Sequence, residues 1–129
     1  VYKKGLSNKR LYEEIESMHY QKKSFTADCA EPKSIDELRG YGLRVEKSQK
    51  GKDSITHGIQ YIQDFEIIIH PRCVNFITEI GNYTWDEDRL GNKINRPIDD
   101  FNHLMDSMRY AVEKYAFGRV KVRTFKGGI

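Results

Sequence analysis

Short β-prone runs alternate with amphipathic helical patterns along the chain, and this alternation limits the possible folds more than any other feature. The runs SFTAD, GLRVEKS and EIIIH (residues 66–70) are each followed by a helical pattern. Consecutive strands that are joined by helices usually lie parallel in one sheet, with helices covering its faces. We therefore expect an α/β domain of three layers with a largely parallel sheet, in which EIIIH is the most deeply buried strand.

Apolar residues at helical spacing, together with capping residues, predict where the helices begin. We expect Ser7 to cap the first helix and Asp53 to cap the third. Ser34 and Glu37 have the spacing of a capping box for the second helix. Pro71 suits the first turn of the fourth helix, because proline is well tolerated there.

The last third of the chain predicts a hairpin and a long helix. Residues 83–97 have β-prone ends around a polar centre that contains Gly91, which is typical of a β-hairpin. Residues 99–115 follow as the strongest helical pattern of the chain. In the basic tail beyond it, Arg119, Lys121 and Arg123 alternate as in a charged edge strand.

Composition limits the class of protein. The chain has 129 residues and a net charge of +3, from 22 basic and 19 acidic residues, which fits one globular domain and permits a polyanionic partner. No apolar run reaches the roughly 18 residues of a membrane span, and the N-terminal residues lack the apolar core of a signal peptide. A glycine-rich phosphate loop is absent, so we expect no ATPase centre.

Two cysteines are too few for a disulfide scaffold and fit a reducing compartment. His70 and Cys73 are three residues apart, and Cys29 could approach them, but structural zinc normally needs four ligands in paired clusters. We therefore expect buried free thiols at both cysteines rather than a zinc site.

Candidate chemistry lies in the last helix and at the end of the first strand. His103 and Asp106 are three residues apart beside an apolar stripe, and Asp28 closes the strand SFTAD. Ligands of open α/β sheets gather beyond the carboxyl ends of strands, so Asp28 and Asp106 converge if the helix packs there. Two such carboxylates favour Mg²⁺ or Mn²⁺, with His103 as a proton relay or phosphate contact. The alternatives are a solvated surface pair on the helix and a turn cap at Asp28.

Basic residues near these positions have two interpretations. Lys47, Lys50 and Lys52 cluster in one glycine-containing loop, and Lys33 follows the strand that ends at Asp28. At one edge of a parallel sheet, these four ammonium groups could hold phosphates. The alternative is a solvated loop, because surface lysines are common.

Three segments resemble, in order, the nuclease domain of phage terminase large subunits: ADCAEPKSIDELRGYG, KGKDSITHGIQYIQDFEIIIHPRC and NYTWDEDRLGNKINRPIDDFNHLMDSMRYA. The likeness covers residues 2–115, and its most specific motifs are D-x-A-E-P-K-S-I-x-E-L-R and N-H-x-x-D-x-x-R-Y-A. The resemblance implies a ribonuclease H-like fold and a divalent-metal endonuclease that cuts concatemeric double-stranded viral DNA during packaging. It also implies that Asp28 and Asp106 are metal ligands for Mg²⁺ or Mn²⁺, with His103 beside them.

The chain departs from the family at its N-terminal end. The family carries a further essential aspartate on the first strand of the sheet, whereas no Asp or Glu precedes Glu13 here. We therefore expect residues 1–129 to be a single nuclease domain that is truncated at its N-terminus, without the ATPase domain. Two acidic ligands hold Mg²⁺ poorly, so we expect little or no cleavage by this chain alone.

The resemblance also implies partners and a location. These are double-stranded DNA, the small terminase subunit, the portal and an upstream ATPase domain, in the host cytoplasm of a phage or prophage. Two other functions stay open at this point. One is a non-catalytic DNA-binding or assembly module of the packaging motor. The other is a flavodoxin-like signalling domain with Asp28 as phosphoacceptor.

Overall fold

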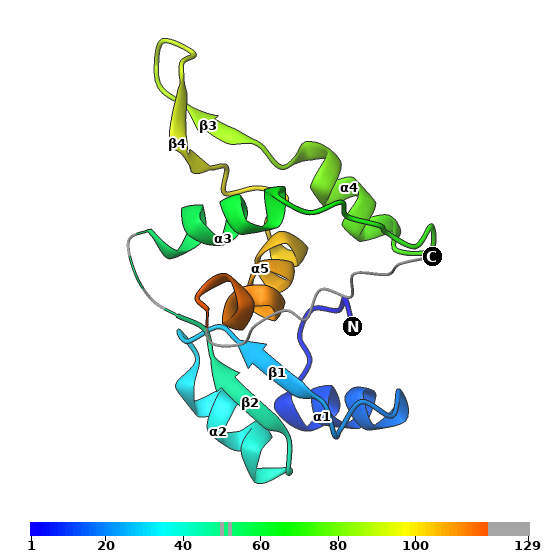
Figure 1. Ribbon diagram of the computed structural model, residues 1–129. Helices are drawn as coiled ribbons and strands as arrows, with labels where there is room; N and C mark the ends of the chain where they lie inside the picture. The colour runs from blue at the N-terminus through cyan, green and yellow to red at the C-terminus, as the bar shows by residue number, and fades with distance from the viewer. Residues whose placement is uncertain (50, 52, 119–129) are drawn as a thin grey trace, which may run out of the picture. The chain divides into compact units, whose positions relative to one another are not determined.

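The computed structural model describes residues 1–49, 51 and 53–118, and the chain forms two compact units, residues 1–50 and 51–129. Helices alternate with short strands in the first unit, and the second unit combines helices with a hairpin, so the expected α/β class is confirmed (Figure 1). The first unit contains α1 (Asn8–Ser17), β1 (Ser24–Ala27), α2 (Pro32–Gly40) and β2 (Arg44–Lys47). The second contains α3 (Ser54–Gln63), α4 (Val74–Asn82), β3 (Trp85–Glu87), β4 (Lys93–Pro97) and α5 (His103–Ala116).

The first unit is built on two parallel strands that α2 connects. β1 pairs with β2 in the register that runs from Ser24↔Arg44 to Ala27↔Lys47. The N–H of Ser48 then donates to the carbonyl of Ala27 at 2.8 Å, which continues the ladder beyond β2. Both strands therefore end at the same edge of the sheet, as the sequence pattern predicts.

The start of α2 differs from the expected capping box. The helix begins at Pro32, so Ser34 lies inside its first turn and caps nothing. Proline is favoured at this position because its fixed φ suits the helix and its missing N–H is not needed there. The Glu37 carboxylate accepts a hydrogen bond from the side-chain amide of Asn8 at 2.8 Å instead, which ties α1 to α2.

The end of α2 is a Schellman turn that delivers the chain into β2. Gly42 has a φ of +96°, and its N–H donates to the carbonyl of Arg39 at 2.9 Å. The N–H of Leu43 reaches back to the carbonyl of Leu38 at 3.2 Å, which is the second bond of this motif. The turn thereby places Leu38 and Leu43 in the core. Only glycine adopts the left-handed conformation at position 42 without strain.

Apolar side chains from α1, α2, β2 and the turn before β2 form the core of the first unit. They are Ile15, Ile35, Leu38, Leu43 and Val45, with Leu11, Tyr12, Phe25 and Ala27 packed against them. The capping of α1 is as predicted, because the Ser7 hydroxyl accepts from the N–H of Arg10 at 3.2 Å. In this half of the chain the Ser7 cap therefore agrees with its local sequence signal, whereas the capping box of α2 does not.

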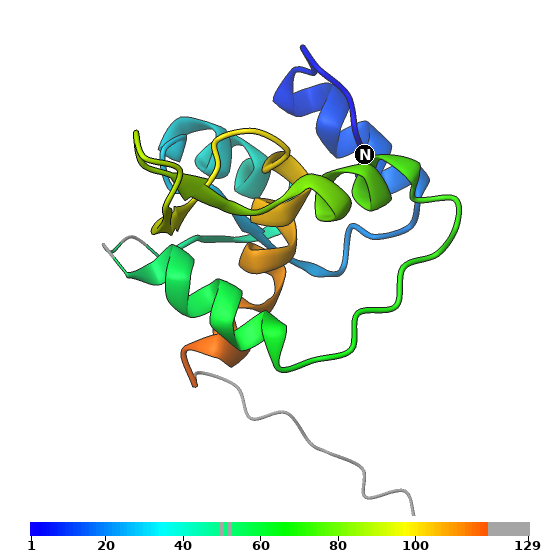
Figure 2. The same ribbon diagram turned by 90° about the horizontal axis from the view of Figure 1, so that it is seen from above.

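The second unit is organised around α5, which packs against both α3 and α4 (Figure 2). At its C-terminal end the carbonyl of Ala116 lies 2.7 Å from Nε2 of His57 on α3. The predicted hairpin is confirmed, since β3 and β4 pair antiparallel from Trp85↔Pro97 to Glu87↔Lys93. The tail residues Arg119, Lys121 and Arg123 lie outside the described residues.

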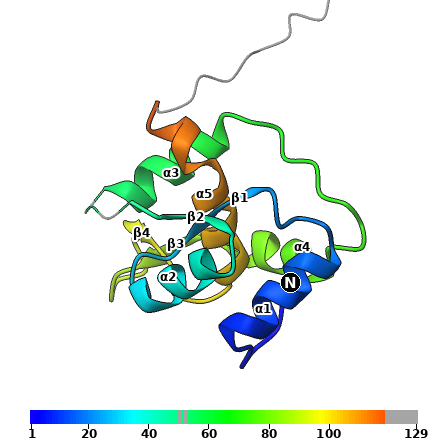
Figure 3. The same cartoon turned by 90° about the horizontal axis from the view of Figure 1, so that it is seen from below.

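The expected strand EIIIH is wrong for this structure. Residues 66–70 carry no strand and form an open connection between α3 and α4 (Figure 3). Ile68 is 88% exposed, and no backbone hydrogen bond joins residues 66–69 to another strand of the described chain. A β-branched run becomes a strand only when a neighbouring strand supplies partners for its N–H and C=O groups. Pro71 likewise lies in a turn ahead of α4, which begins at Val74.

Both cysteines are free, but they are not both buried as expected. Cys29 is half-buried, whereas Cys73 is exposed at the N-terminal end of α4. Cys73 precedes a helix whose first residue, Val74, is itself 62% exposed, so that its environment is open to water. Among the described residues, no helix is long and apolar enough to cross a membrane.

Candidate functional site

Asp28 stands directly after β1 and is held by its surroundings at one oxygen. The N–H of Ala30 donates to Oδ1 at 3.0 Å, which closes a turn of the type that aspartate favours after a strand. The N–H of Cys29 donates to the hydroxyl of buried Ser48 at 3.1 Å. The turn-capping alternative is therefore confirmed as a structural role, and it leaves Oδ2 of this exposed carboxylate without a hydrogen bond from the described chain.

Two of the four predicted DNA-contacting lysines lie near the same sheet edge as Asp28. Lys33 is the second residue of α2, which follows β1, and Lys47 ends β2 in register with Ala27. Both side chains are exposed. Lys50 and Lys52 lie outside the described residues.

The N-terminus of α5 is capped by a residue from α4. The side chain of Asn102 makes no capping hydrogen bond, and the buried Glu79 carboxylate accepts from the N–H groups of Leu104 and Met105 at 2.6 and 3.3 Å. A carboxylate at this place satisfies helix donors and complements the positive end of the helix dipole. Glu79 therefore fixes where α5 begins, and with it the positions of the residues in its first turn.

His103 and Asp106 occupy that first turn. His103 is exposed, and its ring forms no hydrogen bond with the described residues. Oδ1 of Asp106 accepts from Nη2 of Arg109 at 3.0 Å, and the two side chains are 34% and 8% exposed. As at Asp28, one carboxylate oxygen is bound by the protein, while Oδ2 has no hydrogen bond from the described residues.

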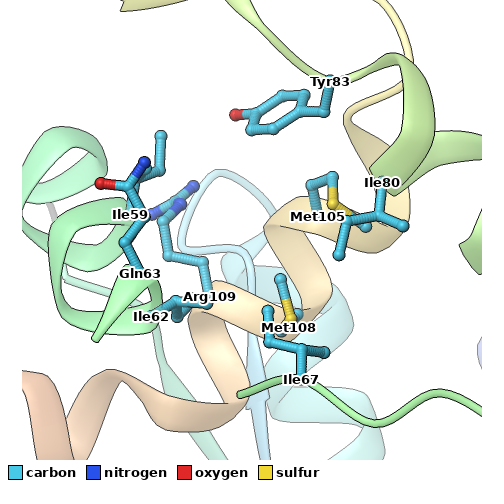
Figure 4. Close-up of a pocket in the computed structure, with 9 residues that line it drawn as sticks. All are labelled: Ile59, Ile62, Gln63, Ile67, Ile80, Tyr83, Met105, Met108 and Arg109. Atoms are coloured by element: carbon cyan, nitrogen blue, oxygen red, sulfur yellow. The ribbon is translucent and has the colours of Figure 1, made fainter. Parts of the chain in front are cut away.

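Arg109 is buried between α5 and α3, and glycine on α3 makes room for it. A Cβ built on Gly58 would lie 2.6 Å from Cγ and 2.8 Å from Cδ of Arg109. Figure 4 shows the Arg109 side chain beside Ile59 and Gln63 of α3, on the wall of an apolar pocket. The guanidinium Nε is buried and has no hydrogen-bond partner among the described residues, whereas Nη2 is paired with the Asp106 carboxylate.

Tyr83 shares this electrostatic environment. Its ring lines the same pocket (Figure 4), and burial raises the pKa of its hydroxyl. The negative charge of Asp106 raises this pKa further, the Arg109 guanidinium lowers it, and Asp99 adds a smaller increase. Tyr83 therefore reports on the charges of Asp106 and Arg109.

The donor chemistry of the two carboxylates fits a hard divalent cation. Asp28 and Asp106 each offer one oxygen that is free of hydrogen bonds from the described residues, and such ligands suit Mg²⁺ or Mn²⁺. Asp28 belongs to the first unit and Asp106 to the second, so their convergence stays a prediction. Within the part of the chain that the structure describes, no three His, Cys, Asp or Glu side chains gather as a metal cluster.

Three residues that support Asp106 were not singled out from the sequence. They are Glu79, Gly58 and Arg109. The spacing of three between Asp106 and Arg109 was a usable local signal, because such residues are neighbours on a helix. Glu79 and Gly58 lie on other helices, so no local pattern could have shown their roles.

Comparison with known proteins assigns the chain to a family. The family described as "Terminase RNAseH like domain" matches residues 1–114. The large terminase subunit of Bacillus phage SPP1 is 35% identical over 113 residues, which is 84% of this chain and 27% of that protein. The PBSX phage terminase large subunit of Bacillus subtilis is 27% identical over 126 residues, or 97% of this chain and 29% of that protein.

Solved structures agree with these relatives. The nuclease domain of the SPP1 large terminase, crystallised with bound Mn, aligns with a TM-score of 0.78 at 34% identity over 84% of this chain and 64% of that one. The large terminase of a thermophilic bacteriophage has the same fold, with a TM-score of 0.69 at 23% identity over 89% of this chain and 30% of that one. The chain spans less than a third of the length of the curated relatives. It belongs to the terminase family of ribonuclease H-like nuclease domains.

Proposed function

We propose that this chain is the metal-dependent endonuclease part of a terminase large subunit, and that it cuts concatemeric double-stranded viral DNA during genome packaging. The observation that carries the proposal is the likeness to the SPP1 nuclease domain that was solved with bound Mn. The free oxygens of Asp28 and Asp106 support it, because both carboxylates can accept a cation without giving up their present hydrogen bonds.

Each candidate residue then has a defined task. Asp28 and Asp106 hold the divalent ions, which when bound activate water and stabilise charge on the leaving oxygen. His103 moves a proton or contacts the scissile phosphate, which its exposed and unbonded ring permits. The ammonium groups of Lys33, Lys47, Lys50 and Lys52 bind the DNA backbone by charge.

The same proposal includes the setting of the activity. Double-stranded DNA is the substrate, and the upstream ATPase domain, the small subunit and the portal are the partners, in the host cytoplasm. The membership in the terminase family supports these partners. For residues 1–129 alone we expect little or no cleavage, because a pair of carboxylates holds Mg²⁺ poorly without further ligands.

Replacement of the two carboxylates tests the proposal. In the natural full-length polypeptide that carries these residues, Asp28→Asn and Asp106→Asn should each reduce Mn²⁺-dependent cleavage of supercoiled plasmid DNA by more than about 100-fold, since even partners of metal ligands matter by 10- to 100-fold. Asp36→Asn is the matched control, because Asp36 is an exposed aspartate that pairs with Arg39 on α2. Circular dichroism checks that each variant keeps its fold.

Two results would contradict the proposal. Undiminished cutting by Asp106→Asn would remove this residue from the mechanism. Salt-sensitive DNA binding without Mn²⁺ binding or cleavage by the full-length protein would favour the non-catalytic DNA-binding or assembly module instead.

A further inference from the structure

Arg109 pairs directly with a candidate ligand, and the proposed mechanism gives it no task. Its Nη2 donates to Oδ1 of Asp106 at 3.0 Å, and the guanidinium is almost fully buried. A side chain that is only 8% exposed has little surface with which to contact a DNA phosphate. Arg109 can therefore influence the site only through the residues that it contacts.

A second pair with the same spacing shows what is unusual here. Asp36 and Arg39 on α2 are also three residues apart, but their N–O distance is 3.4 Å and their side chains are 71% and 45% exposed. Such an exposed pair is held weakly and exchanges with water. The Asp106–Arg109 pair is shorter and shielded on the arginine side, so its geometry is more narrowly defined.

The wall behind Arg109 adds a further constraint. The Cγ and Cδ atoms of Arg109 lie so close to Gly58 that a side chain at that position of α3 would force the stem of Arg109 to move. The stem is thus confined by the backbone of a neighbouring helix, while the guanidinium points to Asp106. This confinement keeps the guanidinium beside the Asp106 carboxylate, where it occupies one of the two oxygens.

We propose that Arg109 is a positioning residue that restricts Asp106 to binding a metal through one oxygen, and that it thereby favours Mg²⁺ and Mn²⁺ over Ca²⁺. The proposal rests on the function proposed above, in which Asp106 is a metal ligand. Ca²⁺ takes six to eight oxygens and often binds both oxygens of a carboxylate, whereas Mg²⁺ demands octahedral geometry with fewer protein ligands. When arginine holds one oxygen of a carboxylate, the other oxygen can bind a metal alone, which suits Mg²⁺ and Mn²⁺ better than Ca²⁺.

Calorimetric titration of Mn²⁺ and Ca²⁺ into the full-length polypeptide tests this inference without measuring cleavage. Arg109→Lys keeps the positive charge but loses the planar fork, so Mn²⁺ affinity should fall about 10-fold. Ca²⁺ affinity should fall less or rise, so that the ratio of the two affinities shifts toward Ca²⁺. Gly58→Ala should shift the ratio in the same direction, because the added methyl group displaces the stem of Arg109.

Gly81→Ala is the matched control for the glycine variant. Gly81 also lies inside a helix, but a Cβ there meets no atom within 4 Å, so both ion affinities should stay unchanged. Asp106→Asn is the control for the proposed function itself and should lose Mn²⁺ binding. If Arg109→Lys fails to fold, as judged by circular dichroism, Gly58→Ala carries the test.

The possible failures are separable. If Asp106→Asn loses Mn²⁺ but Arg109→Lys and Gly58→Ala keep the wild-type affinity ratio, the positioning role is wrong and the proposed function stands. An equal loss of both ions in a folded variant also overturns ion selection, because a purely structural defect would do the same. If Asp106→Asn binds Mn²⁺ like the wild type, the proposed function fails and the inference fails with it.

Discussion

The two units of this chain bury different kinds of side chain. In the first unit the buried core is apolar and is drawn from Ile15, Ile35, Leu38, Leu43 and Val45. Among the described residues of the second unit, the charged side chains of Glu79, Arg109 and Glu113 are buried beside Met105, and large apolar residues such as Ile68 and Leu90 are exposed. The buried core of the first unit is therefore apolar, whereas buried charged side chains lie around α5 in the second.

This difference extends to the two candidate ligands. The backbone around Asp28 is fixed by the sheet ladder, by the Ala30 turn and by Ser48. Asp106 is placed instead by side chains that pack around α5, namely Glu79 at the start of the helix and Arg109 behind the carboxylate. The segment around Asp28 is thus held by backbone hydrogen bonds, whereas Asp106 depends on side chains that a single substitution can remove.

The largest expected effect comes from the apolar core of the first unit. Ile35 is 1% exposed, so Ile35→Ala should lower the free energy of unfolding by about 2–5 kcal/mol through lost burial and a cavity. Ile68→Ala is the matched control in the second unit, where the same side chain is 88% exposed and should change stability little. Urea unfolding followed by circular dichroism measures both, and equal losses would contradict the contrast between the units.

A smaller effect is expected from the cap of α5. Glu79→Ala removes the acceptor of two backbone N–H groups, and loss of a helix cap costs about 0.5–2 kcal/mol. Glu87→Ala serves as the control, because Glu87 forms a half-exposed pair with Lys93 on the hairpin. Hydrogen exchange of the first-turn amides of α5 should rise in Glu79→Ala and stay unchanged in Glu87→Ala; unchanged exchange in both would show that Glu79 does not hold the helix.

The subtlest effect is on the titration of Tyr83. Asp106→Asn should lower the pKa of Tyr83, because it removes a negative charge that raises it, and Arg109→Met should raise this pKa further. The tyrosine ring carbon signals followed by nuclear magnetic resonance measure both changes, with Asp36→Asn as a control outside the cluster.

The raised pKa of Tyr83 makes the free energy of unfolding fall at alkaline pH. The folded state favours the protonated hydroxyl of Tyr83. Its contribution to the free energy of unfolding is therefore present below the pKa of an unfolded tyrosine and is lost as the pH rises through the pKa of Tyr83 in the folded protein. Tyr83→Phe should therefore flatten the alkaline fall in the free energy of unfolding. If the pKa of Tyr83 is unchanged in both Asp106→Asn and Arg109→Met, the charges of Asp106 and Arg109 do not act on Tyr83.

Local elements of this chain were predictable from its amino-acid order. The Ser7 cap, the parallel ends of β1 and β2, the hairpin over 83–97 and the helix that carries Asp106 all follow from patterns within a few residues. These patterns succeed because caps, turns and periodic apolar faces depend on neighbours in the sequence. Two expected caps fail, since the Asp53 side chain makes no capping hydrogen bond at α3 and the Ser34–Glu37 capping box does not form. The expected strand at 66–70 fails for the opposite reason, since a strand needs a partner that its own sequence does not contain.

Residue type and spacing were enough to name the candidate ligands. They were not enough to name the residues that hold those ligands in place. Glu79 reaches the start of α5 from 25 residues away, and Gly58 confines Arg109 from another helix. Such contacts are chosen by packing between helices, which depends on the shapes of both surfaces and has no signature in either segment alone. The sequence by itself therefore determined which chemical groups are available, whereas packing between helices determined the position of the Asp106 carboxylate.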